Sequence, residues 1–156
     1  MTDDLDPAAI ARAIIEDNLY MVLGTADRDG RPWVTPVYYA PASPREFLWV
    51  SRPDATHSRN LDVRRDVSIV IFDSSVPIGT GQGVYMSGTA EELSGEACAE
   101  AVEIFSRRSL GHHGREWTTV DVQGPAPHRL YRATAAEQFV LDEHDERVPV
   151  TRASSA

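Results

Sequence analysis

The sequence predicts a mainly β domain, in which an antiparallel sheet closes into a barrel and helices lie at its rim. Most strand-length apolar segments are joined by short turns, which favours antiparallel pairing. The chain has 156 residues, enough for one domain with its own core. We expect a single domain over residues 1–150 and a disordered tail over residues 151–156.

The first segments predict a helix followed by a hairpin. Asp6 suits a helix N-cap, Pro7 the first helical position, and the helix is expected to end near Asn18. Strands are expected over 19–25 and 33–39 around a tight turn at 27–30. Proline within the second of these strands indicates a sheet edge or a bulge. A turn over 41–44 then leads to a third strand over 47–51.

A short helix and two strands form the middle of the chain. Asp54 or Thr56 is expected to cap a helix that runs to about Arg64. The continuous apolar run 67–72 predicts a central strand. A glycine-rich loop over 77–83 precedes a long strand over 84–93, in which Gly88 marks a bend or bulge.

The last third begins with a helix that Ser94 caps and that runs to about Leu110. Its expected apolar face consists of Ala97, Ala101, Ile104 and Phe105. No regular element is expected over 111–127. Two strands follow, over 129–133 and 138–142, with Ala135-Ala136 between them and an acidic turn over 142–146 at the end.

Composition limits the function classes. The net charge of −9 and the isoelectric point near 4.9 argue against nucleic acid or an anionic membrane as a partner. All 15 basic residues are arginine, so no lysine is available for a Schiff base or a phosphate contact. Cys98 is the single cysteine, which excludes an intrachain disulfide or a CxxC site. With neither a signal peptide nor a long apolar run, we expect a cytoplasmic protein.

One point of the chain gathers hydrogen-bonding groups suited to an anion. The strand ending at Ser51 is followed by a polar turn and a helix start, where hydroxyls, a histidine and free backbone N–H groups meet. A helix N-terminus with such neighbours can hold a phosphate. The candidate residues are Ser51, Thr56, His57, Arg59 and Asn60, and the alternative is an ordinary capped helix with a solvated basic face.

Three segments together resemble the pyridoxamine 5'-phosphate oxidase-related flavin-binding split barrels: LGTADRDGRPWVTPVYYA, FLWVSRPDATHSRNL and GVYMSGTAEEL. The resemblance covers roughly residues 10–142. It implies a six-stranded antiparallel split β-barrel and a homodimer. It also implies FMN, or a deazaflavin such as coenzyme F-420, in a cleft between the two subunits.

The resemblance departs from the true oxidase at its cationic positions. Thr35 and Ala40 stand where the oxidase has an arginine and a lysine, and Thr56 and His57 stand where it has an arginine–lysine pair. The C-terminal arginine motif that holds the vitamin substrate is only faintly echoed by Arg129. We therefore expect a generic flavin pocket and no oxidation of pyridoxamine phosphate.

The same resemblance implies which residues line the flavin. Thr35, Pro36, Val37 and Tyr38 would follow the isoalloxazine, although a strand that simply packs in the barrel is an equal alternative. Gln82 would contact the ring or serve as a plain loop amide. Trp49 and Val50 complete the candidate lining, although a position in the barrel core is the favoured interpretation for Trp49.

The remaining sequence patterns give little evidence of a metal site or of hydrolase chemistry. His112 and His113 are adjacent and lack metal-ligand spacing, so we expect no metal and favour a loop that closes over the partner's cofactor. No Ser–His–Asp or paired-carboxylate pattern supports a hydrolase.

We expect an oxidoreductase that binds FMN, transfers hydride through N5 and acts on a small-molecule substrate or electron donor, with no catalytic side chain of its own. The alternatives are a deazaflavin-dependent reductase, a non-catalytic binder of flavin, haem or another planar ligand, and a dimeric scaffold with an empty cleft.

Overall fold

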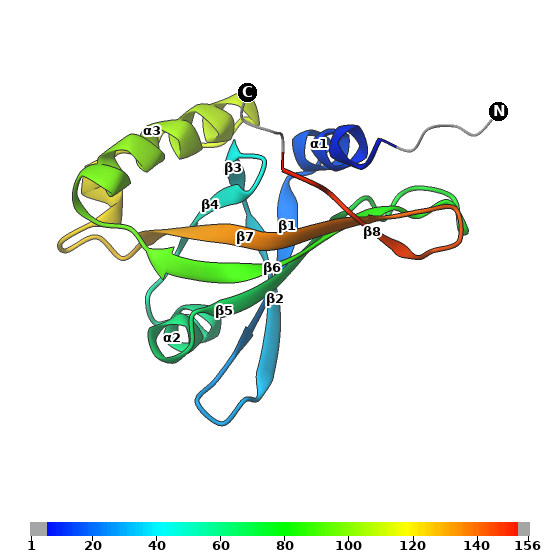
Figure 1. Ribbon diagram of the computed structural model, residues 1–156. Helices are drawn as coiled ribbons and strands as arrows, with labels where there is room; N and C mark the ends of the chain where they lie inside the picture. The colour runs from blue at the N-terminus through cyan, green and yellow to red at the C-terminus, as the bar shows by residue number, and fades with distance from the viewer. Residues whose placement is uncertain (1–5, 153–156) are drawn as a thin grey trace.

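A curled antiparallel sheet of eight strands dominates the computed structural model, which describes residues 6–152 (Figure 1). The strands are β1 (Tyr20–Ala26), β2 (Pro32–Tyr38), β3 (Ala40–Ser43), β4 (Glu46–Ser51), β5 (Asp66–Phe72), β6 (Gly83–Glu92), β7 (Arg129–Leu141) and β8 (Arg147–Pro149). The helices are α1 (Pro7–Asp17), α2 (Thr56–Val63) and α3 (Gly95–Gly111), with a 3-10 turn η1 (Thr119–Val122). This mainly β architecture with helices at the rim is the predicted split barrel.

The order of strands explains why the barrel is split. The sheet runs β2-β1-β5-β6-β7-β4-β3, with β8 paired to β7, and every pairing is antiparallel. The sheet curls until β2 approaches β4, although these two strands are not hydrogen-bonded neighbours. Pro32 and Pro36 therefore lie on the edge strand β2, as their missing N–H groups require.

Helices close the two ends of the curled sheet and cover part of its outer face. α1 packs against β5, β6 and β7 at one end, and α2 packs against β1 and β2 at the other (Figure 1). The core between them contains fully buried side chains such as Leu23, Trp49 and Ile71. α3 covers a second core over β3 and β4, around Leu48 and Phe105.

The local signals at α1 and at the β6 bulge are confirmed. The Asp6 carboxylate accepts a hydrogen bond from Ala9 N at 3.2 Å, and Pro7 opens α1. The register of β6 shifts between Ser87 and Gly88. A Cβ on Gly88 would collide with the carbonyl oxygen of Thr134, so the close approach of β7 requires glycine there.

Two strand predictions were wrong. The expected turn over 41–44 contains the strand β3, which tolerates Pro41 because it forms the other edge of the sheet. The two strands expected over 129–142 are one strand, β7. Ala136 has no β6 partner, because Ala135 pairs with Gly88 and Glu137 with Ser87. The apparent break is thus a bulge within a continuous strand. The short strands β3 and β8 account for the difference between the expected six strands and the observed eight.

Helix caps and one helix face also differ from expectation. Ala55, not Asp54 or Thr56, is the N-cap of α2, because the Asp54 carboxylate pairs with Arg52 at 3.2 Å instead. Ala97 is exposed, and Cys98 and Val102 are buried beside Ala101 and Phe105, so the apolar face of α3 is rotated.

The ends of the chain add two observations. Of the tail expected over 151–156, residues 153–156 lie outside the described residues, and Thr151 and Arg152 are exposed without regular structure. Among the helices of residues 6–152, none combines the length and the apolar character needed to cross a bilayer.

Candidate functional site at the β4–α2 junction

The junction between β4 and α2 positions the candidate phosphate ligands. Ser51 is the last residue of β4, and Pro53 follows in a turn that Ala55 N closes by donating to the carbonyl of Arg52 at 3.2 Å. The proline lacks the N–H that a continued strand would need, so the chain leaves the sheet here. α2 then starts at Thr56, close to the end of β4.

A histidine and a serine meet at this junction. His57 Nε2 lies 2.8 Å from Ser51 Oγ, within hydrogen-bonding distance. The His57 residue is only 8% exposed, and burial lowers the pKa of its imidazole below the usual 6.5. The ring is therefore neutral at pH 7 and presents one donor and one acceptor.

The first turn of α2 has unused hydrogen-bond donors. No side chain of residues 6–152 caps the helix, and the first intrahelical bond runs from Arg59 N to Ala55 O at 3.0 Å. The N–H groups of Thr56, His57 and Ser58 precede that bond. These backbone donors suit an anion. The Ser58 hydroxyl is not among them, because the residue is only 2% exposed and its side chain lies next to Tyr131 in the core.

Two of the predicted phosphate ligands have different surroundings. Asn60 is buried, and its Nδ2 donates to Thr25 Oγ1 at 3.0 Å, which ties α2 to β1. Arg59 is exposed and can reach solvent. The structure thus brings Ser51 and His57 together at the start of α2, where Thr56 is the first helical residue, whereas Asn60 anchors the helix.

Arg129 is a site residue that sequence reasoning underrated. It lies directly opposite Ser51 in the β4–β7 register, so the two side chains share a face of the sheet. Its guanidinium donates to the carbonyls of Ala126 and His128, each at 2.7 Å, and of Gly124 at 2.9 Å. Arg129 therefore stands opposite the end of β4, with its guanidinium held against the loop 124–128, and only the strand register reveals this placement.

The predicted isoalloxazine contacts on β2 are divided between two faces of the strand. Val37 is buried in the core, and Thr35 shares its face. Pro36 and Tyr38 point the other way, and Tyr38 Oη lies 2.8 Å from His112 Nδ1 while its ring packs on Phe105. Because these side chains alternate between the two faces, only the backbone edge of β2 could lie along a flat ring over all four residues.

Trp49 and Val50 lie away from the junction surface. Trp49 is fully buried and stacks on Tyr131 with ring centroids 5.5 Å apart, so its indole belongs to the core. Its Nε1 has no hydrogen-bond partner among the described residues. Val50 packs under α3 in the second core.

Gln82 lies at the opposite end of β7 from Ser51. Its Nε2 donates to Leu141 O at 2.8 Å, and its Oε1 accepts from Leu141 N at 2.8 Å. Because Ser51 pairs with Arg129 at the start of β7, Gln82 does not reach the junction within one chain.

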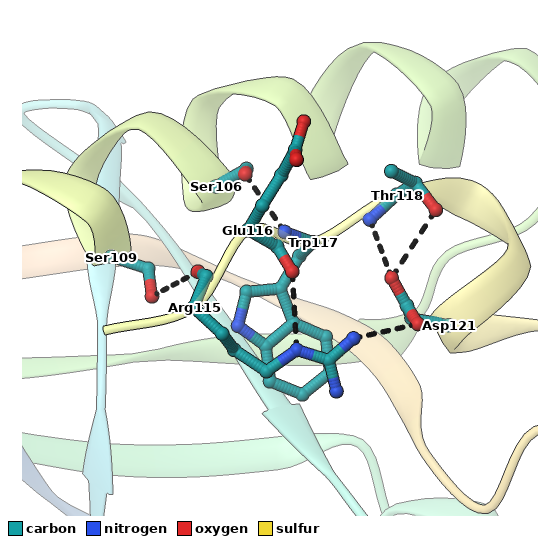
Figure 2. A network of polar contacts seen from close by, with 7 residues as sticks. All are labelled: Ser106, Ser109, Arg115, Glu116, Trp117, Thr118 and Asp121. Atoms are coloured by element: carbon teal, nitrogen blue, oxygen red, sulfur yellow. Dashed lines mark hydrogen bonds and ion pairs between the residues drawn. The ribbon is translucent and has the colours of Figure 1, made fainter.

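The segment after α3 is held against that helix (Figure 2). Ser106 Oγ accepts from Trp117 N at 2.8 Å, and Ser109 Oγ donates to Arg115 O at 2.8 Å. The Arg115 guanidinium lies over the Trp117 ring at 4.3 Å and pairs with Asp121 at 2.7 Å. The segment is therefore docked on its own subunit. Within residues 6–152 no group of three or more His, Cys, Asp or Glu residues is arranged to hold a metal ion.

Comparisons with known proteins agree with this architecture. A family model described as pyridoxamine 5'-phosphate oxidase matches residues 8–141. None of the curated proteins matches the sequence.

Solved structures share the fold at low identity. A heme-binding protein from Mycobacterium smegmatis is 18% identical, with 92% of this chain and 57% of that chain covered and a TM-score of 0.74. A heme storage protein from Vibrio cholerae is 18% identical, with 85% and 92% covered and a TM-score of 0.60. A pyridoxine phosphate oxidase family protein from Clostridium acetobutylicum, related to general stress protein 26, is 15% identical, with 91% and 92% covered and a TM-score of 0.60.

Proposed function

Because this chain belongs to the pyridoxamine 5'-phosphate oxidase family of split barrels, we propose that it binds FMN and acts as a flavin-dependent oxidoreductase. The observation that carries the proposal is the β4–α2 junction, where the Ser51–His57 pair adjoins the uncapped first turn of α2. These groups offer several hydrogen-bond donors to a phosphate. Arg129 stands opposite Ser51 at the end of β4.

The residues present fit the phosphate of a flavin in a particular way. His57 is neutral and Ser51 is a hydroxyl, so the donors at the junction hold the anion mostly through dipoles. Ala40, where the true oxidase has a lysine, is fully buried in β3. This supports a flavin protein that does not oxidise pyridoxamine phosphate.

The role of the protein in the reaction is to hold and shield the cofactor. Bound flavin would supply hydride transfer at N5. The backbone edge of β2 would lie along the ring, and the α2 N-terminus would bind the phosphate. No side chain at the junction is assigned as a proton donor or acceptor to a substrate.

We further propose that the protein is a homodimer that pairs through the outer face of β1, β2, β5 and β6. This face carries exposed apolar side chains, among them Tyr20 at 59% and Val34 at 65% exposed. It also contains a hollow of about 430 Å³ lined by Val22, Val70 and Tyr85. A large apolar surface of this kind favours association. A second copy would also allow Gln82 to approach the other chain's cofactor.

Two alternative ligands would use the same β4–α2 junction. A deazaflavin such as coenzyme F-420 would use the same junction, and the mostly neutral donors suit its phosphate as well. A non-catalytic binder of haem or another planar ligand is supported by the shared fold of the heme-binding protein from Mycobacterium smegmatis and the heme storage protein from Vibrio cholerae. In either case the junction would hold an anionic group and β2 would flank a flat ring.

The test is an absorbance spectrum of the purified protein, followed by titration with FMN, the deazaflavin and haem. A flavin spectrum or tight FMN uptake supports the proposal, and turnover with a reduced nicotinamide and an electron acceptor distinguishes an enzyme from a binder. Preferential uptake of deazaflavin or haem over FMN would show that the site binds that ligand instead. Binding of none of the three overturns the proposal.

A further inference from the structure

A second hollow lies at the end of the barrel that α1 closes, far along the fold from the β4–α2 junction. It has a volume of about 670 Å³ and lies between α1, the turn from β3 to β4 and the segment that follows β8. Figure 1 shows these three segments converging at that end of the sheet, while α2 lies at the other. The volume is in the range of sites for small organic molecules.

The floor of this hollow is apolar. Ala11 and Ile15 of α1 reach it from one side, and both are at most 4% exposed. Val150, 7% exposed, and Pro44 of the β3–β4 turn contribute from the other sides. An occupant therefore needs an apolar body.

Arginines surround the same hollow. Arg12, Arg45 and Arg152 line it together with Glu16 and Glu46, which leaves an excess of one positive charge. No carboxylate of residues 6–152 lies within 4.0 Å of any of these three guanidinium groups. Arg152 is near enough to lower the pKa of Arg45, in addition to the larger effect of burial.

Arg45 is held in place by the bulge of β7. Its Nη1 donates to Ala136 O at 3.0 Å, and its Nη2 donates to Val150 O at 2.6 Å. A guanidinium has five N–H donors, so several remain after these two bonds. The side chain thus offers a fixed, partly unused donor set next to a second arginine.

We propose that this hollow binds a small organic carboxylate, with its apolar body on Ala11, Ile15 and Val150 and its carboxylate between Arg45 and Arg152. A planar carboxylate matches the fork of a guanidinium and accepts two hydrogen bonds from it. It would also offset the repulsion between Arg45 and Arg152, neither of which has a carboxylate of residues 6–152 within 4.0 Å. The site is separate from the proposed flavin site and does not depend on it.

The test uses the full chain, with benzoate and octanoate as probes and benzamide as a neutral isostere of benzoate. In amide-resolved NMR titrations we expect shifts at Ala11, Ile15 and Val150, and saturation by benzoate at a concentration about tenfold or more below that of benzamide. Equal binding of benzoate and benzamide, or shifts confined to other parts of the chain, would overturn the proposal.

Two variants test whether the Arg152 guanidinium binds the carboxylate of the probe. Arg152→Gln removes a guanidinium that makes no hydrogen bond within the described structure, so the fold should be retained, and benzoate should bind about tenfold more weakly. Arg28→Gln, in the exposed β1–β2 turn, is the matched control and should bind as the natural chain does. Unchanged benzoate affinity in Arg152→Gln contradicts the proposal.

Discussion

His57 Nε2 lies 2.8 Å from Ser51 Oγ, and this pair joins the end of β4 to the first turn of α2. The two residues are six positions apart, on opposite sides of a proline turn. Because the histidine is buried and neutral, the pair offers hydrogen bonds without a charge of its own. The phosphate site that we propose depends on this arrangement.

Replacing His57 with glutamate tests that site. His57→Glu puts a negative charge beside the bound phosphate and should weaken FMN binding by about 2 kcal/mol or more through repulsion. Fluorescence titration with FMN measures the affinity. His144→Glu, in the exposed β7–β8 turn, is the control and should leave it unchanged. Unchanged affinity in a folded His57→Glu protein would move the phosphate elsewhere.

We expect the free energy of unfolding to fall as the pH is lowered, because His57 is buried. Burial lowers the pKa of His57 in the folded state, so below about pH 6.5 the unfolded chain binds more protons and unfolding is favoured. The same direction holds for His112, whose pKa is lowered by burial and by Arg108 and His113. Thermal melts from pH 7.5 to about pH 5 measure the slope, and His57→Gln should flatten it. An equal slope in that variant would contradict the assignment.

Gly88→Ala should severely destabilise the sheet. The new Cβ would collide with Thr134 O on the neighbouring strand, and neither backbone can move freely. We expect a loss of about 2–4 kcal/mol in the free energy of unfolding, measured by urea denaturation. Gly81→Ala is the matched control, because its Cβ would enter open space. A Gly88→Ala protein as stable as the control would rule out the bulge geometry.

Arg108 should contribute to stability by joining α3 to α1. Its guanidinium donates to Asn18 O, at the C-cap of α1, at 2.9 Å and to Tyr39 O, between β2 and β3, at 3.1 Å. Arg108→Met should cost about 2–3 kcal/mol, as hydrogen bonds from a charged donor do. Arg107→Met, on the exposed side of the same helix, should change the urea midpoint little. Equal midpoints for the two variants would show that these bonds contribute nothing.

The proposed dimer interface can be tested by measuring self-association. Val34→Glu places an unpaired charge on the outer sheet face and should weaken self-association by about 2 kcal/mol or more. Sedimentation equilibrium measures the change, and Val120→Glu on η1, at a site 74% exposed, is the control. If Val34→Glu associates as the natural chain does, the dimer uses another face.

Local chemistry made several elements predictable. Asp6 and Pro7 mark the start of α1, and the prolines of β2 mark an edge strand, because capping and a missing N–H act within a few residues. Gly88 is predictable as a bend or bulge because a glycine inside a strand pattern marks one, although the close approach of Thr134 that requires it is tertiary. The expected strand break at Ala135-Ala136 was wrong, since pairing with β6 and the bond from Ala135 N to Arg45 O keep β7 continuous.

The sequence by itself determined the curled antiparallel sheet with rim helices and placed Ser51, Thr56 and His57 at one junction, because strand periodicity and a strand–turn–helix are written locally. Only the tertiary structure decided that Arg129 lies opposite Ser51, that Trp49 is core and that Tyr38 pairs with His112. The tertiary structure also forms the hollow beside Arg45 and Arg152. These relationships join residues far apart in the chain through strand register and packing, and local propensity carries no information about either.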